Sequence, residues 1–178
     1  MLIRDILEES EKKYADIIAL KWLKKKDIQE RNYRDLMEKV MLVRKGLLAE
    51  GFGGKHIALI GTSSVEWIES YLGIITGKTV AVPLDAGLPA EDLIDMINRS
   101  DSEGLFLSPK NKSMLDEIIA GCPGLKKIWM LQEEELEEVC WMDYEECHRR
   151  ILDGTLPNCI YEDEFRMVGE YLKETDMK

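Results

Sequence analysis

Apolar residues in the first fifty positions of this chain recur mainly at the three- and four-residue spacing of amphipathic helices. The pattern predicts a helix, two short strands and a long helix, over 2–13, 17–23, 27–29 and 33–48. The basic turn Lys24-Lys25-Lys26 would join the two strands into a small hairpin. Asn32 and Asp35 are placed as N-cap and capping-box acid of the long helix, which Gly51 is placed to end.

Beyond Gly51 the pattern alternates between short apolar strands and amphipathic helices. The predicted strands are 56–60, 79–82, 104–107 and 127–131. The predicted helices are 63–76, one that has Pro89 at its first position, and 110–120 closed by Gly121. Strands separated by helices imply a mostly parallel sheet with helices on both faces. The fold class is therefore α/β, with the hairpin as a small N-terminal addition.

Local signals define the ends of the predicted helix 63–76 and of the strand 79–82 that follows it. Ser63 and Glu66 form an S-x-x-E capping box at the start of the predicted helix. Gly77 suits the C-cap because glycine tolerates positive φ. The strand 79–82 is continuously apolar, as a strand buried on both faces is. Pro83 is expected to end this strand because proline has no N–H donor for the ladder.

The last part of the chain has a different character. Glu133 to Glu138 is a dense acidic run, which we expect to be solvated. Two further helices are predicted, one from Asp143 that stops at Gly154 and one over 162–173. The sequence therefore divides into an α/β part, 1–131, and an acidic and helical extension, 132–178.

Composition narrows the classes of partner. The chain has 178 residues, of which 45% are hydrophobic and 33% are charged, as in ordinary globular proteins. A formal net charge of -11 argues against non-specific binding to nucleic acid or to anionic lipid. No apolar run approaches the roughly 20 residues of a membrane helix, and the first residues lack the pattern of a signal peptide. We expect a cytoplasmic protein with reduced cysteines.

Two loops are the places where a small ligand would sit, because ligands of open α/β sheets collect beyond the carboxyl ends of the strands. These loops are Gly61 to Ser64 and Asp85 to Leu88. The first follows a strand and opens a helix, a geometry that can hold an anion, although helix capping is the commoner use. Gly51 to Lys55 runs from a helix into a strand, the reverse of a phosphate loop, so it is read as a cap and turn.

Other chemistry-bearing side chains have simpler interpretations. Cys140, Cys147, His148 and Cys159 do not have the spacing of zinc ligands. Neither His56 nor His148 lies near a nucleophile motif. Lys21 with the three lysines of the turn is expected at a solvated hairpin tip, and the tryptophans are expected to pack: Trp22, Trp67, Trp129 and Trp141. We assign no catalytic, cofactor-binding or metal-ligating residue.

Three segments together resemble the adenylate-forming, AMP-binding enzymes, which include acyl-CoA synthetases, adenylation domains of peptide synthetases and luciferases. Asn32-Tyr33-Arg34-Asp35-Leu36 is similar to the first core motif of the family, usually Thr-Tyr-x-Glu-Leu. The segment 56–67 resembles its strand–Gly–Asn–Ser–x–Glu–Trp segment, with Ser63 where Asn is usual. Leu72 to Asp85 resembles its second core motif, with Ile and Thr before the glycine in place of Lys-Ala.

The resemblance implies a flavodoxin-like N-terminal subdomain of an AMP-forming acid–thiol ligase, an acyl-CoA synthetase. Such an enzyme converts ATP and a carboxylic acid to acyl-AMP and pyrophosphate, and then passes the acyl group to coenzyme A. ATP, Mg²⁺ and CoA are implied for the full enzyme. None is expected to bind this piece, because the phosphate loop of the family is expected after Lys178, which is read as a truncation ahead of the chemistry.

The implied partners are the remainder of the parent chain and a small carboxylic acid, with no nucleic acid and no membrane span. The sequence leaves open which acid is used and whether the acceptor thiol belongs to CoA or to a carrier protein. Two further interpretations stay open at this stage: a non-catalytic α/β module for protein interaction, and an independent flavodoxin-like nucleotide binder.

Overall fold

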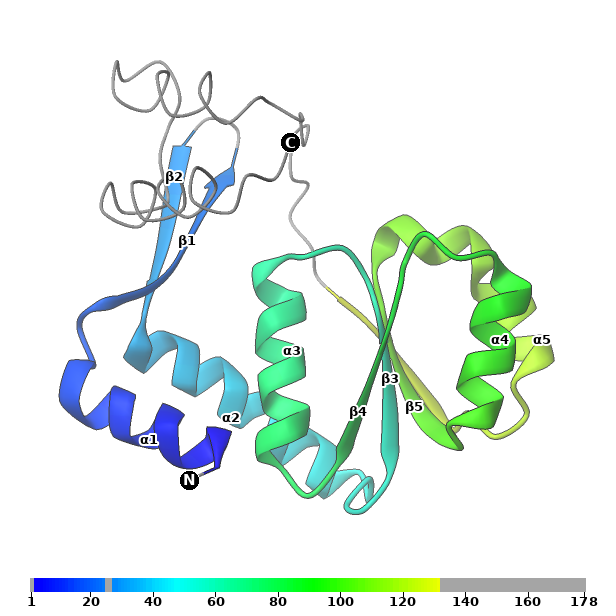
Figure 1. Ribbon diagram of the computed structural model, residues 1–178, viewed down its shortest axis with the longest axis horizontal. Coiled ribbons are helices and arrows are strands. Elements are labelled where there is room, and N and C mark those ends of the chain that lie inside the picture. Colours follow the sequence, from blue (N-terminus) through cyan, green and yellow to red (C-terminus); the bar gives the residue numbers. More distant parts are fainter. Residues whose placement is uncertain (1, 25–26, 132–178) are drawn as a thin grey trace, which may run out of the picture. The chain divides into compact units, whose positions relative to one another are not determined.

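A computed structural model describes residues 2–24 and 27–131 of the chain. Its elements follow the predicted order: α1 Ile3–Tyr14, β1 Ile18–Lys24, β2 Asp27–Asn32, α2 Tyr33–Ala49, β3 His56–Ile60, α3 Val65–Thr76, β4 Val80–Leu84, α4 Ala90–Arg99, β5 Ser102–Leu107, the 3₁₀ helix η1 Pro109–Met114, α5 Leu115–Gly121 and β6 Lys127–Met130 (Figure 1). The predictions for 132–178, including both helices and the domain boundary, fall outside the described residues.

The chain divides into two compact units, 1–20 with 31–133, and 21–30 with 134–178. The described part of the second unit is the outer half of the β1–β2 hairpin, where Lys21 forms an ion pair with Glu30 at 2.9 Å. Within the described residues, the first unit holds all the other elements and both hydrophobic clusters. The candidate site is built entirely from the first unit.

Four parallel strands in the order β4-β3-β5-β6 form the central sheet. In Figure 1, α3 covers one face of this sheet, and α4 and α5 cover the other. Successive residues of β3 therefore enter different clusters: Ala58 and Ile60 pack with α4 and α5, whereas Ile57 and Leu59 pack with α2 and α3. A strand buried on both faces has to be apolar at every position, which explains the run Ile57 to Ile60. The α/β prediction is confirmed.

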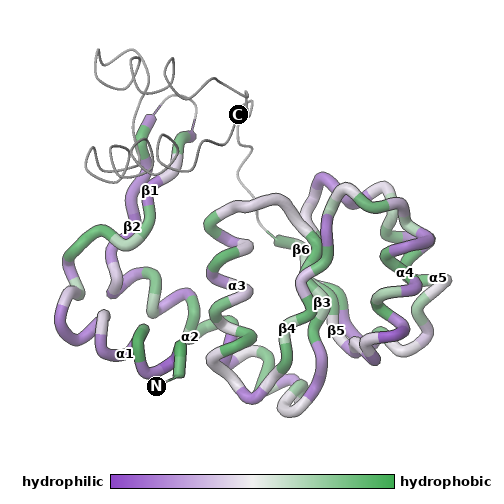
Figure 2. The backbone as a smooth tube through the Cα atoms, in the orientation of Figure 1, coloured by the Kyte–Doolittle hydropathy of each residue, from purple (hydrophilic) through white to green (hydrophobic). Residues whose placement is uncertain are grey.

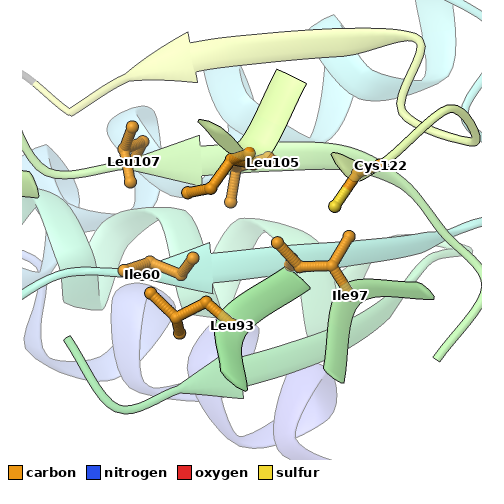
Figure 3. Close-up of a cluster of buried hydrophobic side chains, with 8 residues drawn as sticks. Ile60, Leu93, Ile97, Leu105, Leu107 and Cys122 are labelled. Carbon is orange, nitrogen blue, oxygen red and sulfur yellow. The ribbon is translucent and has the colours of Figure 1, made fainter. Parts of the chain in front are cut away.

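The core on the α4 and α5 side is closely packed. Ile60, Leu93, Ile97, Leu105, Leu107 and Cys122 all point into it (Figure 3). Only one face of helix α4 contacts this core, so purple and green positions alternate along its tube in Figure 2. On the other side of the sheet, Trp129 stacks on Phe106 with ring centroids 4.8 Å apart, and Trp67 stacks on Tyr71 at 5.3 Å. These two tryptophans pack as expected, Trp22 is half-buried, and Trp141 falls outside the described residues.

Strand β4 differs from its prediction. It pairs with β3 only and so lies at an edge of the described sheet, where Val80 is 48% exposed. The expectation of burial on both faces was therefore wrong, because an apolar run alone does not distinguish a central strand from an edge strand. Pro83 does not end the strand either: it lies within β4 opposite Leu59. An edge strand tolerates proline, since the missing N–H can face away from the ladder.

The ends of α1, α2 and α3 lie within two residues of their predicted positions, with two changes of mechanism. Asn32 caps α2 by accepting the Asp35 N–H at 2.8 Å, as predicted. The cap of α3 is Ser64, whose hydroxyl accepts the Trp67 N–H at 3.1 Å, and not Ser63. Gly77 is the C-cap of α3, but its φ is -79°. Glycine avoids a tight contact there, because a Cβ would lie 3.3 Å from the carbonyl oxygens of Gly73 and Ile74.

Two further boundaries moved. The helix predicted over 110–120 is half 3₁₀ helix, since η1 occupies Pro109–Met114 before α5 begins. Proline at the first position of η1 and the Ser108 hydroxyl, which accepts the Lys110 N–H at 3.2 Å, favour this tight turn. Pro89 is the N-cap of α4 and not its first residue. Gly51 follows α2 with φ of 83°, as expected for a glycine that ends a helix.

Candidate functional site

Three loops that follow β3, β4 and β5 line an open pocket of about 550 Å³ at the carboxyl edge of the sheet. Its lining comes from all three loops: Gly61, Thr62, Ser63, Asp85, Ala86, Gly87, Lys110 and Asn111. The strands β4, β3 and β5 are neighbours in the sheet, so their carboxyl ends bring the loops together. Pockets of roughly 300–1,000 Å³ are the size that small molecules and cofactors occupy.

Hydrogen bonds tie these loops to one another before any ligand arrives. The Ser108 N–H donates to the Ile60 carbonyl at 2.8 Å and links the β5 loop to the end of β3. The side-chain amide of Asn111 donates to the Ala86 carbonyl at 2.8 Å and links the same loop to the turn after β4. That turn is closed by Asp85, whose Oδ1 accepts the Gly87 N–H at 2.8 Å. The walls of the pocket are therefore preorganised.

The polar groups of the pocket are of both signs. Lys110 contributes an exposed ammonium group with no ion pair among residues 2–24 and 27–131, and Asp85 contributes an exposed carboxylate. Thr62 and Ser63 add two exposed hydroxyl groups. Asn111 is only 7% exposed, and so is the one strongly buried polar side chain among the described lining residues.

The two loops that the sequence indicated are indeed brought together here. Six of the lining residues belong to 61–64 and 85–88. Ser64 turns inward to cap α3, and Leu88 packs against the core on the α4 side. Lys110 and Asn111 also line the pocket but were not predicted from the sequence. Their place directly after a strand predicted at 104–107 was the only signal, and it was obscured because that stretch was assigned to a regular helix.

Other candidates among the described residues have structural roles. The glycines at 51 and 54 have φ of 83° and 81°, which confirms a cap and turn in the loop before β3. His56 Nδ1 lies 2.5 Å from the Ser100 carbonyl oxygen and so contacts the backbone. No group of three or more His, Cys, Asp or Glu side chains suited to a metal ion occurs in the described ranges. The residues weighed as zinc ligands in the sequence lie outside these ranges: Cys140, Cys147, His148 and Cys159.

At the opposite edge of the sheet, one carboxylate lies between two lysines. Glu103 accepts from the Lys55 ammonium at 2.6 Å and also contacts the ammonium of Lys126. Hydrogen bonds from Lys126 and then from Lys55 lower the pKa of Glu103 below its usual value of 4.5. The cluster links the starts of β3, β5 and β6 through paired charges, which explains it without a ligand.

None of the helices described in the structure has the length and apolar character needed to cross a membrane.

Comparison with known proteins connects this architecture to one family. The model of the AMP-binding enzyme family matches residues 7–153. The chain belongs to this family. The match includes all three segments whose resemblance was noted in the sequence, and the parallel sheet agrees with N-terminal domains of adenylate-forming ligases.

Relatives of this AMP-binding chain include a CoA ligase and a hybrid synthetase. A CoA ligase from Gibberella moniliformis is 31% identical over 94 residues, which are 49% of this chain and 16% of that protein. The hybrid PKS-NRPS synthetase mycA from Thermothelomyces thermophilus is 38% identical over 63 residues, 35% of this chain and 2% of that protein. The chain thus spans a small part of the curated relatives that it matches.

A solved structure supports the fold. Coronafacic acid ligase from Pectobacterium brasiliense superposes with a TM-score of 0.67 and 21% identity, covering 78% of this chain and 27% of that chain. At this identity the likeness concerns the fold. The AMP-binding chain therefore shares the fold of the part of that ligase which it matches.

Proposed function

We propose that this chain is the N-terminal subdomain of an AMP-forming acid–thiol ligase, and specifically of an acyl-CoA synthetase. The family match over residues 7–153 carries this proposal. The CoA ligase relative and the fold shared with acid ligases support the choice of CoA as acceptor. The parent enzyme would join ATP and a carboxylic acid into acyl-AMP with release of pyrophosphate, and then transfer the acyl group to the thiol of CoA.

The contribution of this piece is to build the sheet and to hold three preorganised loops at its carboxyl edge. Adenylation also needs donors that stabilise the charge on the triphosphate, Mg²⁺ and a cation near the carboxylate. The described pocket provides one unpaired ammonium group, that of Lys110. We therefore propose that the 178-residue chain alone does not complete adenylation, and that ATP, Mg²⁺ and CoA serve the complete enzyme.

The first test uses the parent protein as its source genome encodes it. Purified parent protein is mixed with ATP, Mg²⁺, CoA and a panel of carboxylic acids, and both pyrophosphate and acyl-CoA are measured. We expect pyrophosphate release that depends on one class of acid, together with the matching acyl-CoA by mass spectrometry. Absence of acid-dependent pyrophosphate from a folded parent protein would refute the proposal.

The second test puts the 178-residue chain in the same assay, with the parent protein as positive control. We expect no pyrophosphate above background from the chain. Turnover would show that the chain contains its own catalytic groups, and would contradict the second part of the proposal.

The alternative acceptor is the thiol of a carrier protein, and the similarity to a hybrid PKS-NRPS synthetase favours it. The two acceptors are distinguished at the second half-reaction. A parent enzyme that releases pyrophosphate and retains acyl-AMP in the presence of CoA, but loads a phosphopantetheine-bearing carrier, would be an adenylation domain.

A further inference from the structure

The β1–β2 hairpin has little packing of its own. Among the described strands, β1 and β2 pair only with each other. Neither strand, as described over 18–24 and 27–32, contains a buried residue. The boundary between the two compact units crosses the hairpin, after Leu20 and before Arg31. Since a two-stranded hairpin without a buried face is marginally stable in water, its outer half should open independently of the core.

Arg31 is the first residue of β2 beyond this boundary, and its side chain reaches a buried carboxylate. Arg31 Nη1 contacts Glu69 Oε1 of α3, and the two side chains are 20% and 9% exposed. Glu69 lies one turn before Gly73, on the face of α3 that meets Val43 of α2. A carboxylate within a helix–helix interface depends on its counterion, because a buried charge without a partner is strongly unfavourable.

The backbone just after this arginine connects the start of α2 to the residues that follow α1. The Tyr33 N–H donates to the Ile17 carbonyl at 3.0 Å, and the Arg34 N–H donates to the Ala15 carbonyl at 3.0 Å. An opening of the hairpin that passed residue 31 would break both hydrogen bonds and withdraw the guanidinium from Glu69. An opening confined to the outer half leaves all three contacts intact. The longer opening is therefore the one that leaves a buried carboxylate without its counterion.

We propose that the Arg31–Glu69 ion pair limits the local opening of the hairpin. It allows the outer half to open while it holds the start of α2 in place. Arg31 cannot leave without exposing the interface of α2 and α3 to an unpaired charge, so the opening ends at the preceding residue. The proposal concerns a motion of this chain and does not depend on its proposed function as part of a ligase.

The test is hydrogen exchange of the isotope-labelled 178-residue chain, followed by NMR at single amides. In the unsubstituted chain we expect fast exchange in the outer half of the hairpin and slow exchange at Tyr33 and Arg34. Glu69→Gln removes the charge that would lose its counterion, so exchange at Tyr33 and Arg34 should become at least about tenfold faster. The amide of Leu105 in the central strand β5 reports opening of the whole fold, and its exchange should change less than about threefold. Unchanged exchange at Tyr33 and Arg34, or equal acceleration at all three amides, would overturn the proposal.

Two variants at Arg31 separate the charge of the side chain from its packing. Arg31→Lys keeps a cation that can reach the carboxylate, so exchange at Tyr33 and Arg34 should stay within about threefold of the unsubstituted rate. Arg31→Gln removes the cation, and exchange at the same two amides should become at least about tenfold faster. Equal acceleration by the two variants would show that the shape of the arginine, and not its charge, limits the opening, and would refute the proposal.

Glu30→Gln is the matched control on the other side of the boundary. It removes the carboxylate of the Lys21–Glu30 ion pair, whose side chains are 31% and 42% exposed, so water already solvates these charges. Exchange at Tyr33 and Arg34 should therefore be unchanged in this variant. An acceleration there as large as that caused by Glu69→Gln would show that any charge of the hairpin has the same effect, and would contradict a specific role for the buried pair.

Discussion

Gly73 of α3 lies so close to Val43 of α2 that a Cβ atom on Gly73 would be 2.6 Å from the Cβ of Val43. The same added atom would lie 3.1 Å from the carbonyl oxygen of Val40. The two helices therefore meet at a point where only a hydrogen atom fits. This contact sets the position of α3, and with it the position of the loop from Gly61 to Ser64 that opens the pocket.

Gly73→Ala should consequently destabilise the fold, although alanine is the better helix former. We expect a loss of about 1–3 kcal/mol in the free energy of unfolding, the usual cost of overpacking. Urea unfolding followed by far-UV circular dichroism would measure it. Gly46→Ala in α2 is the matched control, because nothing lies within 4 Å of its added Cβ. That change should stabilise the protein by about 0.5–1 kcal/mol.

Ser64→Ala should cost about 0.5–2 kcal/mol of unfolding free energy, because the Trp67 N–H loses its acceptor at the start of α3. Ser63→Ala should change stability by less than about 0.5 kcal/mol, since Ser63 is exposed and caps nothing. The pair of variants, measured by thermal and urea unfolding, distinguishes the observed cap from the one that the sequence predicted. Equal losses in both would place the cap in doubt.

Glu103 should make stability depend on pH at the acid end. Its pKa in the folded chain is lowered, mainly by the hydrogen bond from Lys126, so folding favours the charged carboxylate. The resulting stabilisation is complete above the unfolded pKa near 4.5 and is lost as pH falls through the lower folded pKa. Between pH 7 and pH 3, the free energy of unfolding of Glu103→Gln should therefore fall less than that of the unsubstituted chain.

The control for Glu103 is Glu38→Gln, which alters an exposed glutamate with no ion pair in the described residues. The free energy of unfolding of this variant should depend on pH as that of the unsubstituted chain does. The lysines around Glu103 are 40% and 64% exposed, so salt screens their interaction with the carboxylate. In 1 M salt, the difference in pH-dependent stability between Glu103→Gln and the unsubstituted chain should therefore be smaller. A difference that persists in salt would contradict an electrostatic origin.

Cys122 should resist alkylation in the folded chain. It is 2% exposed, and burial raises the pKa of its thiol, so both access and thiolate content are low. At pH 8, iodoacetamide should modify the peptide that contains Cys122 at least about tenfold more slowly than in the urea-unfolded chain. Peptide mass spectrometry resolves Cys122 from the other cysteines. Equal rates in the two states would show that the α4–α5 side of the core opens readily.

The fold could be predicted from sequence because its signals are local and repeated. The run Ile57 to Ile60 favours a strand covered on both faces, and Asn32 and Gly51 set the ends of α2 through their own chemistry. The predictions that were wrong concern features that depend on which elements pack beside a strand or helix. Val80 belongs to an equally apolar run, yet it is exposed because no described strand pairs with the outer side of β4.

The candidate site was predictable in part for the same reason. Gly61 to Ser63 and Asp85 to Gly87 follow two recognisable strands, and the rule for carboxyl ends of parallel strands brings them together. Asn111 is different. Its importance arises from a bond to Ala86, 25 residues earlier in the chain, and from a 3₁₀ turn that places it there. Ser108 and Pro109 favour the turn, but nothing in the residues around Asn111 encodes the bond to Ala86.

Pro83 has a consequence for how this chain meets other copies of itself. The Val80 N–H points toward β3, where it donates to the Lys55 carbonyl, and since backbone groups alternate along a strand, the nitrogen of Pro83 faces outward. A strand of another copy that approached the unpaired side of β4 would meet the ring of Pro83 in place of an N–H donor. The proline thereby removes one hydrogen-bond donor from the unpaired side of β4, which disfavours edge-to-edge pairing between copies of the chain.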